Sequence, residues 1–284
     1  MTRTTLRDRL RAGNRLRLIG AHDGLSALLA ERFGFDGTWA SGLGISAVHG
    51  LPDEGLLTMT EFHAAAVQMR QASSLPIVAD VDSGFGDQQV VRRMVRLYEE
   101  AGIDAVCIED KQFPKRNSFQ DGNQLEQLEV AVRRIETAKQ AQRGDDFMVI
   151  ARQESMIAGA GLDDAVVRAH RYHEAGADAL LIHSRRKDAG EVAAYCARVR
   201  ADGIPLPLVC IPTTYHTTTA DQLWSYGISA AVYANQLVRA SARAMELVLE
   251  SLAAVGSTTD VEERIASVSD LFGLVGMDQP AIIH

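Results

Sequence analysis

Eight short apolar runs, separated by longer stretches with helical spacing, limit the fold of this chain more than any other feature. The runs cover residues 16–21, 36–41, 77–82, 105–109, 148–154, 179–183, 208–212 and 231–235. Between them, residues 88–101, 126–141, 162–175 and 190–200 have helical periodicity and are long enough to connect parallel strands. Strands and helices in this alternation predict a closed (β/α)8 barrel, with an open doubly wound sheet as the alternative.

A weak internal repeat supports the same fold. In four places a helix is expected to end at a glycine just before a strand, at Gly34, Gly102, Gly176 and Gly227, and we expect these glycines to adopt the left-handed conformation. No GxGxxG motif follows a strand, so a dinucleotide-binding fold is not favoured. With only 7 prolines and no low-complexity linker, we expect one domain over residues 1–284, with a helical extension at about 236–284.

The composition excludes several classes of function. The formal net charge of −8 disfavours binding to nucleic acid or to an anionic membrane surface. The three cysteines have no CxxC spacing, which argues against a disulfide framework or a zinc site and favours a reducing, cytoplasmic location. The sequence contains no apolar window long enough to span a membrane and no signal-peptide pattern.

Polar side chains gather where the predicted strands end, which is where a parallel barrel builds its active site. The residues at these ends are Trp39, Ser41, Gly42, Asp80, Asp82, Glu109, Asp110, Lys111, Arg152, Glu154, His183, Ser184 and Asn235. For the lone histidine, His183, the alternative is a core position with a satisfied hydrogen bond. The company of Arg152 and several carboxylates favours a functional role.

The carboxylates at these ends predict a metal site. Asp80 and Asp82 are two residues apart on one predicted strand and should share a face, with Glu109 on the adjacent strand. Oxygen ligands without clustered His or Cys favour Mg²⁺, or Mn²⁺, over zinc. Gly84 and Gly86 would then let the backbone pass close to the ion. The alternative is a solvated turn with an aspartate that caps a helix.

Residues 111–127 are predicted to form a mobile lid over the mouth of the site. The segment is too polar for the core, and Pro114 excludes a continuing helix. Lys115, Asn117 and Ser118 would provide donors to an anion once the lid closes. The alternative is a solvated charged loop.

At six places the chain resembles the phosphoenolpyruvate mutase branch of the isocitrate lyase superfamily. The matching segments are WASGL at 39–43, DVDSGFG at 80–86, EDKQFPKRNS at 109–118, IARQES at 150–155, DALLIHS at 178–184 and YANQLVRAS at 233–241. The resemblance implies a (β/α)8 barrel that interconverts phosphoenolpyruvate and phosphonopyruvate, the reaction that forms the C–P bond in phosphonate biosynthesis. It also implies a homo-oligomer, a tetramer or a dimer, that exchanges C-terminal helices.

The resemblance also implies a role for individual residues. Mg²⁺ would be held by Asp80, with Asp82, Glu109 and, through water, Asp53. The backbone at Ser41, Gly42 and Leu43 would bind the substrate carboxylate, with Trp39 packed over the organic part. The phosphoryl oxygens would be held by Arg152, His183, Asn117 and Ser118, and Lys115 would join them when the lid closes.

Three other functions remain open within this resemblance. Phosphonopyruvate hydrolases typically have threonine where this chain has Asn117, so the asparagine favours the mutase. The carbon–carbon lyases have a K-[KR]-C-G-H motif with a catalytic cysteine, whereas residues 115–118 read KRNS and lack it. A barrel that binds pyruvate or phosphate without turnover is the non-enzyme alternative. The segment 212–219, PTTYHTTT, lacks the basic residue that relatives more often carry after Thr213.

Overall fold

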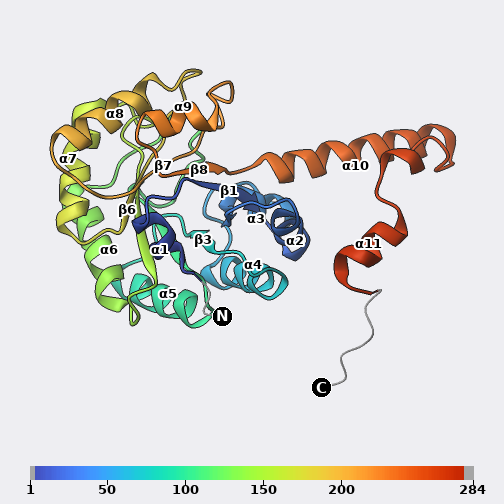
Figure 1. Cartoon of the computed structure of the whole chain (residues 1–284), viewed down its shortest axis with the longest axis horizontal. Helices are drawn as coiled ribbons and strands as arrows, with labels where there is room; N and C mark the ends of the chain where they lie inside the picture. The colour runs from blue at the N-terminus through green and yellow to red at the C-terminus, as the bar shows by residue number, and fades with distance from the viewer. Residues whose placement is uncertain (1–3, 278–284) are drawn as a thin grey trace. The chain divides into compact units, whose positions relative to one another are not determined.

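The structure, a computed structural model, describes residues 4–277 and contains a closed barrel of eight parallel strands (Figure 1). The strands are β1 (Leu16–Ala21), β2 (Gly37–Ala40), β3 (Ile77–Asp80), β4 (Ala105–Glu109), β5 (Met148–Gln153), β6 (Ala179–Ile182), β7 (Leu208–Cys210) and β8 (Ala230–Tyr233). Each strand pairs with the next along the chain, and β8 pairs with β1 to close the barrel. The predicted (β/α)8 barrel is therefore confirmed, and the open sheet is excluded.

Helices surround the strands, as Figure 1 shows. In the first unit they are α1 (Leu6–Arg11), α2 (Gly24–Arg32), α3 (Gly42–Val48), α4 (Met59–Ala72), α5 (Gln88–Glu100), α6 (Leu128–Ala141), α7 (Gly161–Glu174), α8 (Gly190–Ala201) and α9 (Ala220–Ser225). Helix α5 illustrates how they pack: Val91, Met94, Val95 and Tyr98 are buried at helical spacing, and charged residues fill the other face. The four helices that periodicity predicted are present.

The four predicted glycines do adopt the left-handed conformation. Gly34, Gly102, Gly176 and Gly227 have φ values of 69°, 74°, 89° and 94°. Residues with a Cβ adopt this conformation only at an energetic cost, so glycine is the residue that lets the chain turn from each helix back into the barrel.

Apolar side chains fill the barrel interior and close its amino end. The interior cluster contains Trp39, Val78, Ile150 and their neighbours, and Leu6 and Leu10 of α1 belong to the same cluster. Because α1 packs against the first residues of the strands, the interior is covered at that end. A site for a ligand is left at the opposite end, where the strands finish.

The chain divides into two compact units, residues 1–236 and residues 237–284. The second unit contains most of α10 (Gln236–Val255), a short 3₁₀ helix (Glu262–Arg264) and α11 (Val268–Val275). Helix α10 starts where the helical extension was predicted. The domain-swapped arrangement of this extension and its membership of one domain stay predictions. Within residues 4–277, no helix combines the length and the apolarity needed to cross a bilayer.

Candidate active site

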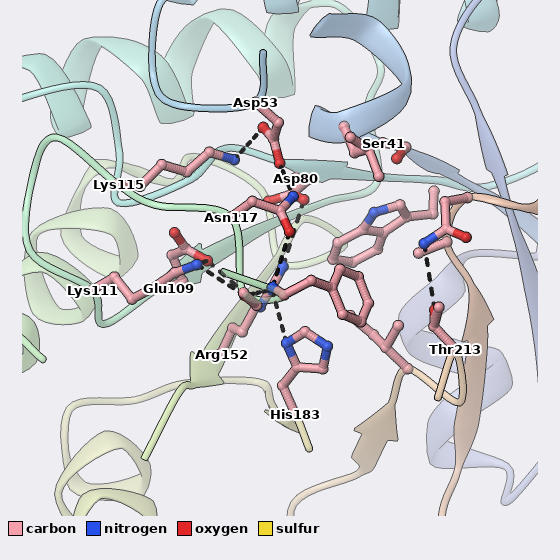
Figure 2. Close-up of a pocket in the computed structure, with 17 residues that line it drawn as sticks. Ser41, Asp53, Asp80, Glu109, Lys111, Lys115, Asn117, Arg152, His183 and Thr213 are labelled. Carbon is pink, nitrogen blue, oxygen red and sulfur yellow. Dashed lines mark hydrogen bonds and ion pairs between the residues drawn. The ribbon is translucent and has the colours of Figure 1, made fainter. Parts of the chain in front are cut away.

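A pocket lies at the carboxyl ends of the strands, and the side chains that line it come from the strand ends and from the predicted lid (Figure 2). The lining residues are Trp39, Ser41, Leu43, Asp53, Asp80, Glu109, Lys111, Lys115, Asn117, Ser118, Phe119, Arg152, His183, Ile211, Thr213, Ala234 and Asn235. Eleven of the thirteen residues to which the resemblance assigned a role are among them. The two that do not line the pocket are Gly42 and Asp82.

The prediction that Asp80 and Asp82 lie on one strand is wrong, because β3 ends at Asp80 and Asp82 has a left-handed backbone with φ 50°. Their carboxylates still converge, since a Cβ on Gly42 would lie 3.3 Å from Oδ2 of Asp80 and 3.5 Å from Oδ1 of Asp82. The Asp82 carboxylate also forms an ion pair with Lys115. Burial, partly offset by Lys115, raises the pKa of Asp82 to about 7. Asp80 remains in the pocket wall.

Gly84 has a different role from the one expected. Its φ is 92°, and a Cβ at this position would lie 2.7 Å from Cγ2 of Val91 in α5. The glycine therefore permits the turn and the close approach of α5, rather than the approach of an ion. Gly42 is the glycine next to the site, since a Cβ there would lie 3.3 Å from Oδ2 of Asp80.

Lys115 and Asn117 connect the lid to the segment before α4. The ammonium of Lys115 lies 2.7 Å from Oδ1 of Asp53, and the Asn117 amide donates a 2.7 Å hydrogen bond to Oδ2 of the same carboxylate (Figure 2). Burial opposes ionisation of Asp53, but Lys115 and Asn117 outweigh it and lower the pKa of this carboxyl. The lid, residues 111–127, has no helix, as predicted; its mobility stays a prediction.

Arg152 lies at the centre of the buried charges. Its Nε lies 2.5 Å from Oε1 of Glu154 and 3.6 Å from Oε2 of Glu109, and its Nη1 lies 3.6 Å from Oδ2 of Asp80. We call the group of buried polar side chains around it the rim cluster. Its members are Asp53, Asp80, Asp82, Glu109, Glu154, Lys111, Lys115, Arg152 and His183.

Lys111 and Glu154 belong to this cluster although the sequence analysis assigned them no role. The ammonium of Lys111 lies 3.3 Å from Glu109 and donates a 2.9 Å hydrogen bond to Ser118 Oγ. Ser118 Oγ in turn donates to Oε2 of Glu154 at 2.8 Å. Both residues stood at predicted strand ends, so their position was visible in the sequence. Their partners were not, because these contacts join different strands and the lid.

One side of the pocket is apolar. Trp39, Leu43, Ile211 and Ala234 form this side, and the lid adds Phe119, whose ring makes an edge contact with His183 at 6.2 Å between centroids. The pocket thus offers a charged wall to an anionic group and an apolar wall to a small carbon skeleton. Thr213, from the segment that lacks the usual basic residue, also lines it and accepts a 3.5 Å hydrogen bond from Asn235.

Helix α3 begins at the pocket. Ser41 caps this helix by accepting the N–H of Gly44, and helix geometry leaves the N–H groups of Gly42 and Leu43 without intrahelical acceptors. These donors lie beside Asp80, since the Gly42 position is within contact distance of its carboxylate.

Part of the predicted metal set fits a hard cation. The oxygen Oε1 of Glu109 is buried without a hydrogen-bond partner, and the missing Cβ of Gly42 leaves room beside Asp80. Oxygen donors of this kind suit Mg²⁺. The Asp82 carboxylate, however, is paired with the ammonium of Lys115. Over residues 4–277, no group of three or more His, Cys, Asp or Glu side chains is arranged to hold a metal.

A second buried network supports the site from behind. Asp110, next to Glu109, points away from the pocket and accepts hydrogen bonds from Tyr172 Oη at 2.7 Å and Arg168 Nη1 at 3.2 Å, both on α7. Its other oxygen accepts the backbone N–H of Glu154 at 2.9 Å. Burial raises the pKa of Asp110 to about 6 despite the guanidinium.

A buried, charged pocket at the carboxyl end of a (β/α)8 barrel is the arrangement found in barrel enzymes. Comparison with known proteins identifies the family: the family model described as phosphoenolpyruvate phosphomutase matches residues 6–253. The chain belongs to the phosphoenolpyruvate phosphomutase family.

Individual relatives are similar to this chain over nearly its whole length. A phosphoenolpyruvate phosphomutase of Tetrahymena pyriformis is 37% identical over 278 residues, covering 97% of this chain and 92% of its own length. The crystal structure of phosphoenolpyruvate phosphomutase from Streptomyces platensis subsp. rosaceus superposes with a TM-score of 0.92 at 47% identity, with 96% of each chain covered. A phosphonopyruvate hydrolase in complex with oxalate and Mg²⁺ superposes with a TM-score of 0.89 at 36% identity, covering 96% of this chain and 94% of that one.

The network behind the site gives a test of buried charge. Replacing Arg168 by Met leaves the Asp110 carboxyl without its guanidinium, and we expect a loss of about 3–5 kcal/mol of unfolding free energy at pH 8. In the folded protein the pKa of Asp110 is already above its ordinary value, so its contribution to stability falls as the pH rises through about 6. Since Arg168→Met raises this pKa further, the loss should be smaller at pH 5 than at pH 8 in urea denaturation.

Arg171 provides the matched control on the same helix. It pairs with the exposed Glu129 at 2.8 Å, and such surface pairs contribute about 1 kcal/mol or less. Arg171→Met should therefore lower stability only slightly and equally at both pH values. Equal losses for the two variants would contradict the structural role of the Asp110 network.

Proposed function

We propose that this chain is a phosphoenolpyruvate mutase, an isomerase that interconverts phosphoenolpyruvate and phosphonopyruvate. The observation that carries the proposal is the lid asparagine, Asn117, whose amide lies in the pocket wall beside Asp53. In the resemblance noted above, asparagine at this position favours the mutase and threonine the hydrolase. Family membership and the mutases among the relatives support the same activity.

The reaction moves one phosphoryl group within one pyruvate skeleton. The bond between phosphorus and C3 breaks, and a bond between phosphorus and the enolate oxygen forms, so atoms and charge balance without a second substrate. A loose, metaphosphate-like transition state leaves the protein to position the group and to balance its charge. In this proposal Arg152, His183 and Asn117 hold the phosphoryl oxygens while the enolate oxygen approaches phosphorus.

The other walls of the pocket suit the pyruvyl part. The first N–H groups of α3, at Gly42 and Leu43, would bind the substrate carboxylate, and Trp39 would pack against the carbon skeleton. Ser41 keeps the start of this helix in place through its cap. These contacts would hold the pyruvyl group while the phosphoryl group changes its point of attachment.

The lid would exclude water from the transferring group. Lys115, Asn117, Ser118 and Phe119 all come from residues 111–127, and the pocket beneath them has a volume of only about 50 Å³. A pocket of this size leaves little room for water beside a bound group. Exclusion of water matters here because water is the competing acceptor that would make the reaction a hydrolysis.

We further propose Mg²⁺, or Mn²⁺ in its place, as the cofactor. The rim cluster has five carboxyl groups against three cations, so its formal charge is negative and a divalent cation would reduce the imbalance. Asp80 and Glu109 would hold the ion, with Asp82 joining after release of Lys115 and with Asp53 acting through water. When bound, the ion would neutralise negative charge on the oxygens of the pyruvyl group. A phosphonopyruvate hydrolase with this fold contains Mg²⁺.

Phosphonopyruvate hydrolysis is the second candidate, since the hydrolase is as similar to the chain as several mutases are. A carbon–carbon lyase is less well supported, because Cys107, Cys196 and Cys210 are all buried and none lines the pocket. A barrel that binds without turnover has no observation in its favour.

As a mutase, the chain would supply phosphonopyruvate for phosphonate biosynthesis, and we place it in the cytoplasm because its three cysteines are free.

We also propose that the protein is a homo-oligomer, a dimer or a tetramer. Helices α10 and α11 have no buried residues, and they expose Met245, Leu249, Leu271 and Phe272. Apolar side chains gathered in this way mark an interaction surface, and a second copy that exchanges the C-terminal helices would cover it.

We expect a mass of at least twice 30.8 kDa in sedimentation velocity. A monomer at micromolar concentration would contradict the exchange.

We expect activity to need a divalent cation. Enzyme treated with a chelator should lose turnover of phosphonopyruvate, and Mg²⁺ should restore it. Asp80→Ala should abolish both activity and Mg²⁺ binding in calorimetry without lowering the melting temperature, because this carboxylate lies among like charges. The control is Asp121→Ala, an exposed carboxylate of the lid that should leave both unchanged. Full turnover without metal would contradict the metal site.

Asn117 provides the test between mutase and hydrolase. Phosphorus NMR should show phosphoenolpyruvate as the first product from phosphonopyruvate, with little inorganic phosphate. Asn117→Ala should lower turnover by about 10²-fold, the scale of one lost transition-state donor. Arg116→Ala, at the neighbouring lid residue whose side chain is exposed, is the matched control and should change turnover little. Phosphate released without passing through phosphoenolpyruvate would identify a hydrolase instead.

A further inference from the structure

Glu154 contacts several side chains of the pocket, yet it does not line the pocket itself. It follows β5 and has no exposed surface. Its carboxylate accepts hydrogen bonds from Arg152 Nε at 2.5 Å and Ser118 Oγ at 2.8 Å, and it lies 3.0 Å from His183 Nδ1. Three side chains that do line the pocket therefore meet at one carboxylate behind it.

The position of Glu154 is itself fixed from behind. Its backbone N–H donates to Asp110, which Tyr172 and Arg168 hold from α7. Burial opposes ionisation of Glu154, but Arg152, His183 and Lys111 outweigh it and hold its pKa well below the ordinary value. The result is a fixed, ionised acceptor that a substrate does not touch.

The contact with His183 determines which ring nitrogen carries the proton. Burial lowers the pKa of His183, so the resting ring is neutral and has one N–H. Its Nδ1 has two neighbours, the Glu154 carboxylate at 3.0 Å and Arg152 Nη2 at 3.1 Å. A carboxylate can only accept a hydrogen bond and a guanidinium can only donate one, so the two contacts require opposite states of Nδ1.

The charge on Glu154 favours the state in which Nδ1 carries the proton and donates it to the carboxylate. A hydrogen bond from Nδ1–H to a carboxylate is charge-assisted, and Arg152 Nη2 has a second acceptor in Ser118 Oγ at 3.1 Å. With Nδ1 committed to Glu154, Nε2 is the nitrogen left for a ligand. The neutral ring then has an unprotonated Nε2, which takes up a second proton from solvent when an anionic group binds. The carboxylate on Nδ1 stabilises this doubly protonated ring, which is the form that donates Nε2–H to an anion.

Ser118 brings the lid into the same arrangement. Its hydroxyl donates to Glu154 and accepts from Lys111 and Arg152. If the lid moves away, Glu154 loses this donor and Arg152 loses an acceptor. Ser118 thus links the lid to Arg152 directly and to His183 through Glu154.

We propose that Glu154 is a positioning residue that fixes the proton of His183 on Nδ1 and holds Arg152, His183 and the lid's Ser118 in one arrangement for binding a phosphoryl group. The proposal rests on the proposed function for the identity of the group that these side chains bind. The tautomer of His183 does not depend on that identity, and it can be measured without substrate.

The test uses three variants of the full chain. Glu154→Gln keeps the shape but cannot serve three donors, and Glu154→Asp keeps the charge but shortens the reach by one methylene. The control is Glu191→Gln, whose carboxylate accepts a hydrogen bond from Ser184, the residue after His183, and does not contact the rim cluster. Each variant is labelled with ¹⁵N-histidine, His183 is assigned from the signal that His183→Gln removes, and melting temperature, kcat and KM are measured.

In wild type and in Glu191→Gln, the ring ¹⁵N shifts of His183 should report a protonated Nδ1. In Glu154→Gln the proton should move to Nε2, because Arg152 then becomes the donor to Nδ1. Turnover of phosphonopyruvate should fall by roughly 10- to 100-fold or more, mainly in kcat, as expected when a residue that orients a functional group is lost. Glu154→Asp should keep the wild-type ring shifts with a smaller loss of kcat.

Unchanged ring shifts or unchanged kcat in Glu154→Gln would overturn the proposal, as would an equal loss of kcat in Glu191→Gln. If Glu154→Gln does not fold, altered ring shifts or unchanged kcat in Glu154→Asp would overturn it. If wild type turns over neither phosphonopyruvate nor phosphoenolpyruvate, the proposed function fails, and the ring shifts still decide whether Glu154 sets the tautomer.

Discussion

The balance of buried charge at the carboxyl end of the barrel governs the rest of this structure. Ionised groups tolerate burial only when opposite charges and hydrogen bonds replace water. In the rim cluster, Arg152 compensates three carboxylates at once, and the lid contributes Lys115 as a further cation. The lid therefore contributes charge to the site as well as a wall, because its Lys115 is paired with both Asp53 and Asp82.

Hydrogen bonds behind the rim cluster hold its charged side chains in position. Asp110 receives the backbone N–H of Glu154 and is held by two side chains of α7, while its own backbone carbonyl accepts the N–H of Glu126 at the far end of the lid. An antiparallel bridge between Lys111 and Leu125 also joins the two ends of the lid. The two ends of the segment are thus joined to each other and to the end of β4, and Asn117 and Ser118 lie between them.

Relatives of this chain are named as mutases, a hydrolase and lyases, so the fold alone does not determine the chemistry. In this chain the lid places Asn117 in the pocket wall, held by Asp53, and none of the three cysteines lines the pocket. The apolar wall around Trp39 and the charged wall around Arg152 together suit a ligand that combines a small carbon skeleton with an anionic group.

The barrel, the glycine turns and most of the pocket could be predicted from the sequence. Periodicity and strand-end polarity are local properties, and the closed parallel barrel brings all strand ends to one rim. The sequence did not predict how the charged groups of the rim cluster pair with one another. Asp82 was expected on the same strand as Asp80, but the strand ends at Asp80, and the left-handed backbone of Asp82 allows its carboxylate to pair with Lys115 of the lid. Glu154 and Lys111 were visible only as strand ends, because their partners come from other strands and from the lid, and only the tertiary structure brings those groups within hydrogen-bond distance.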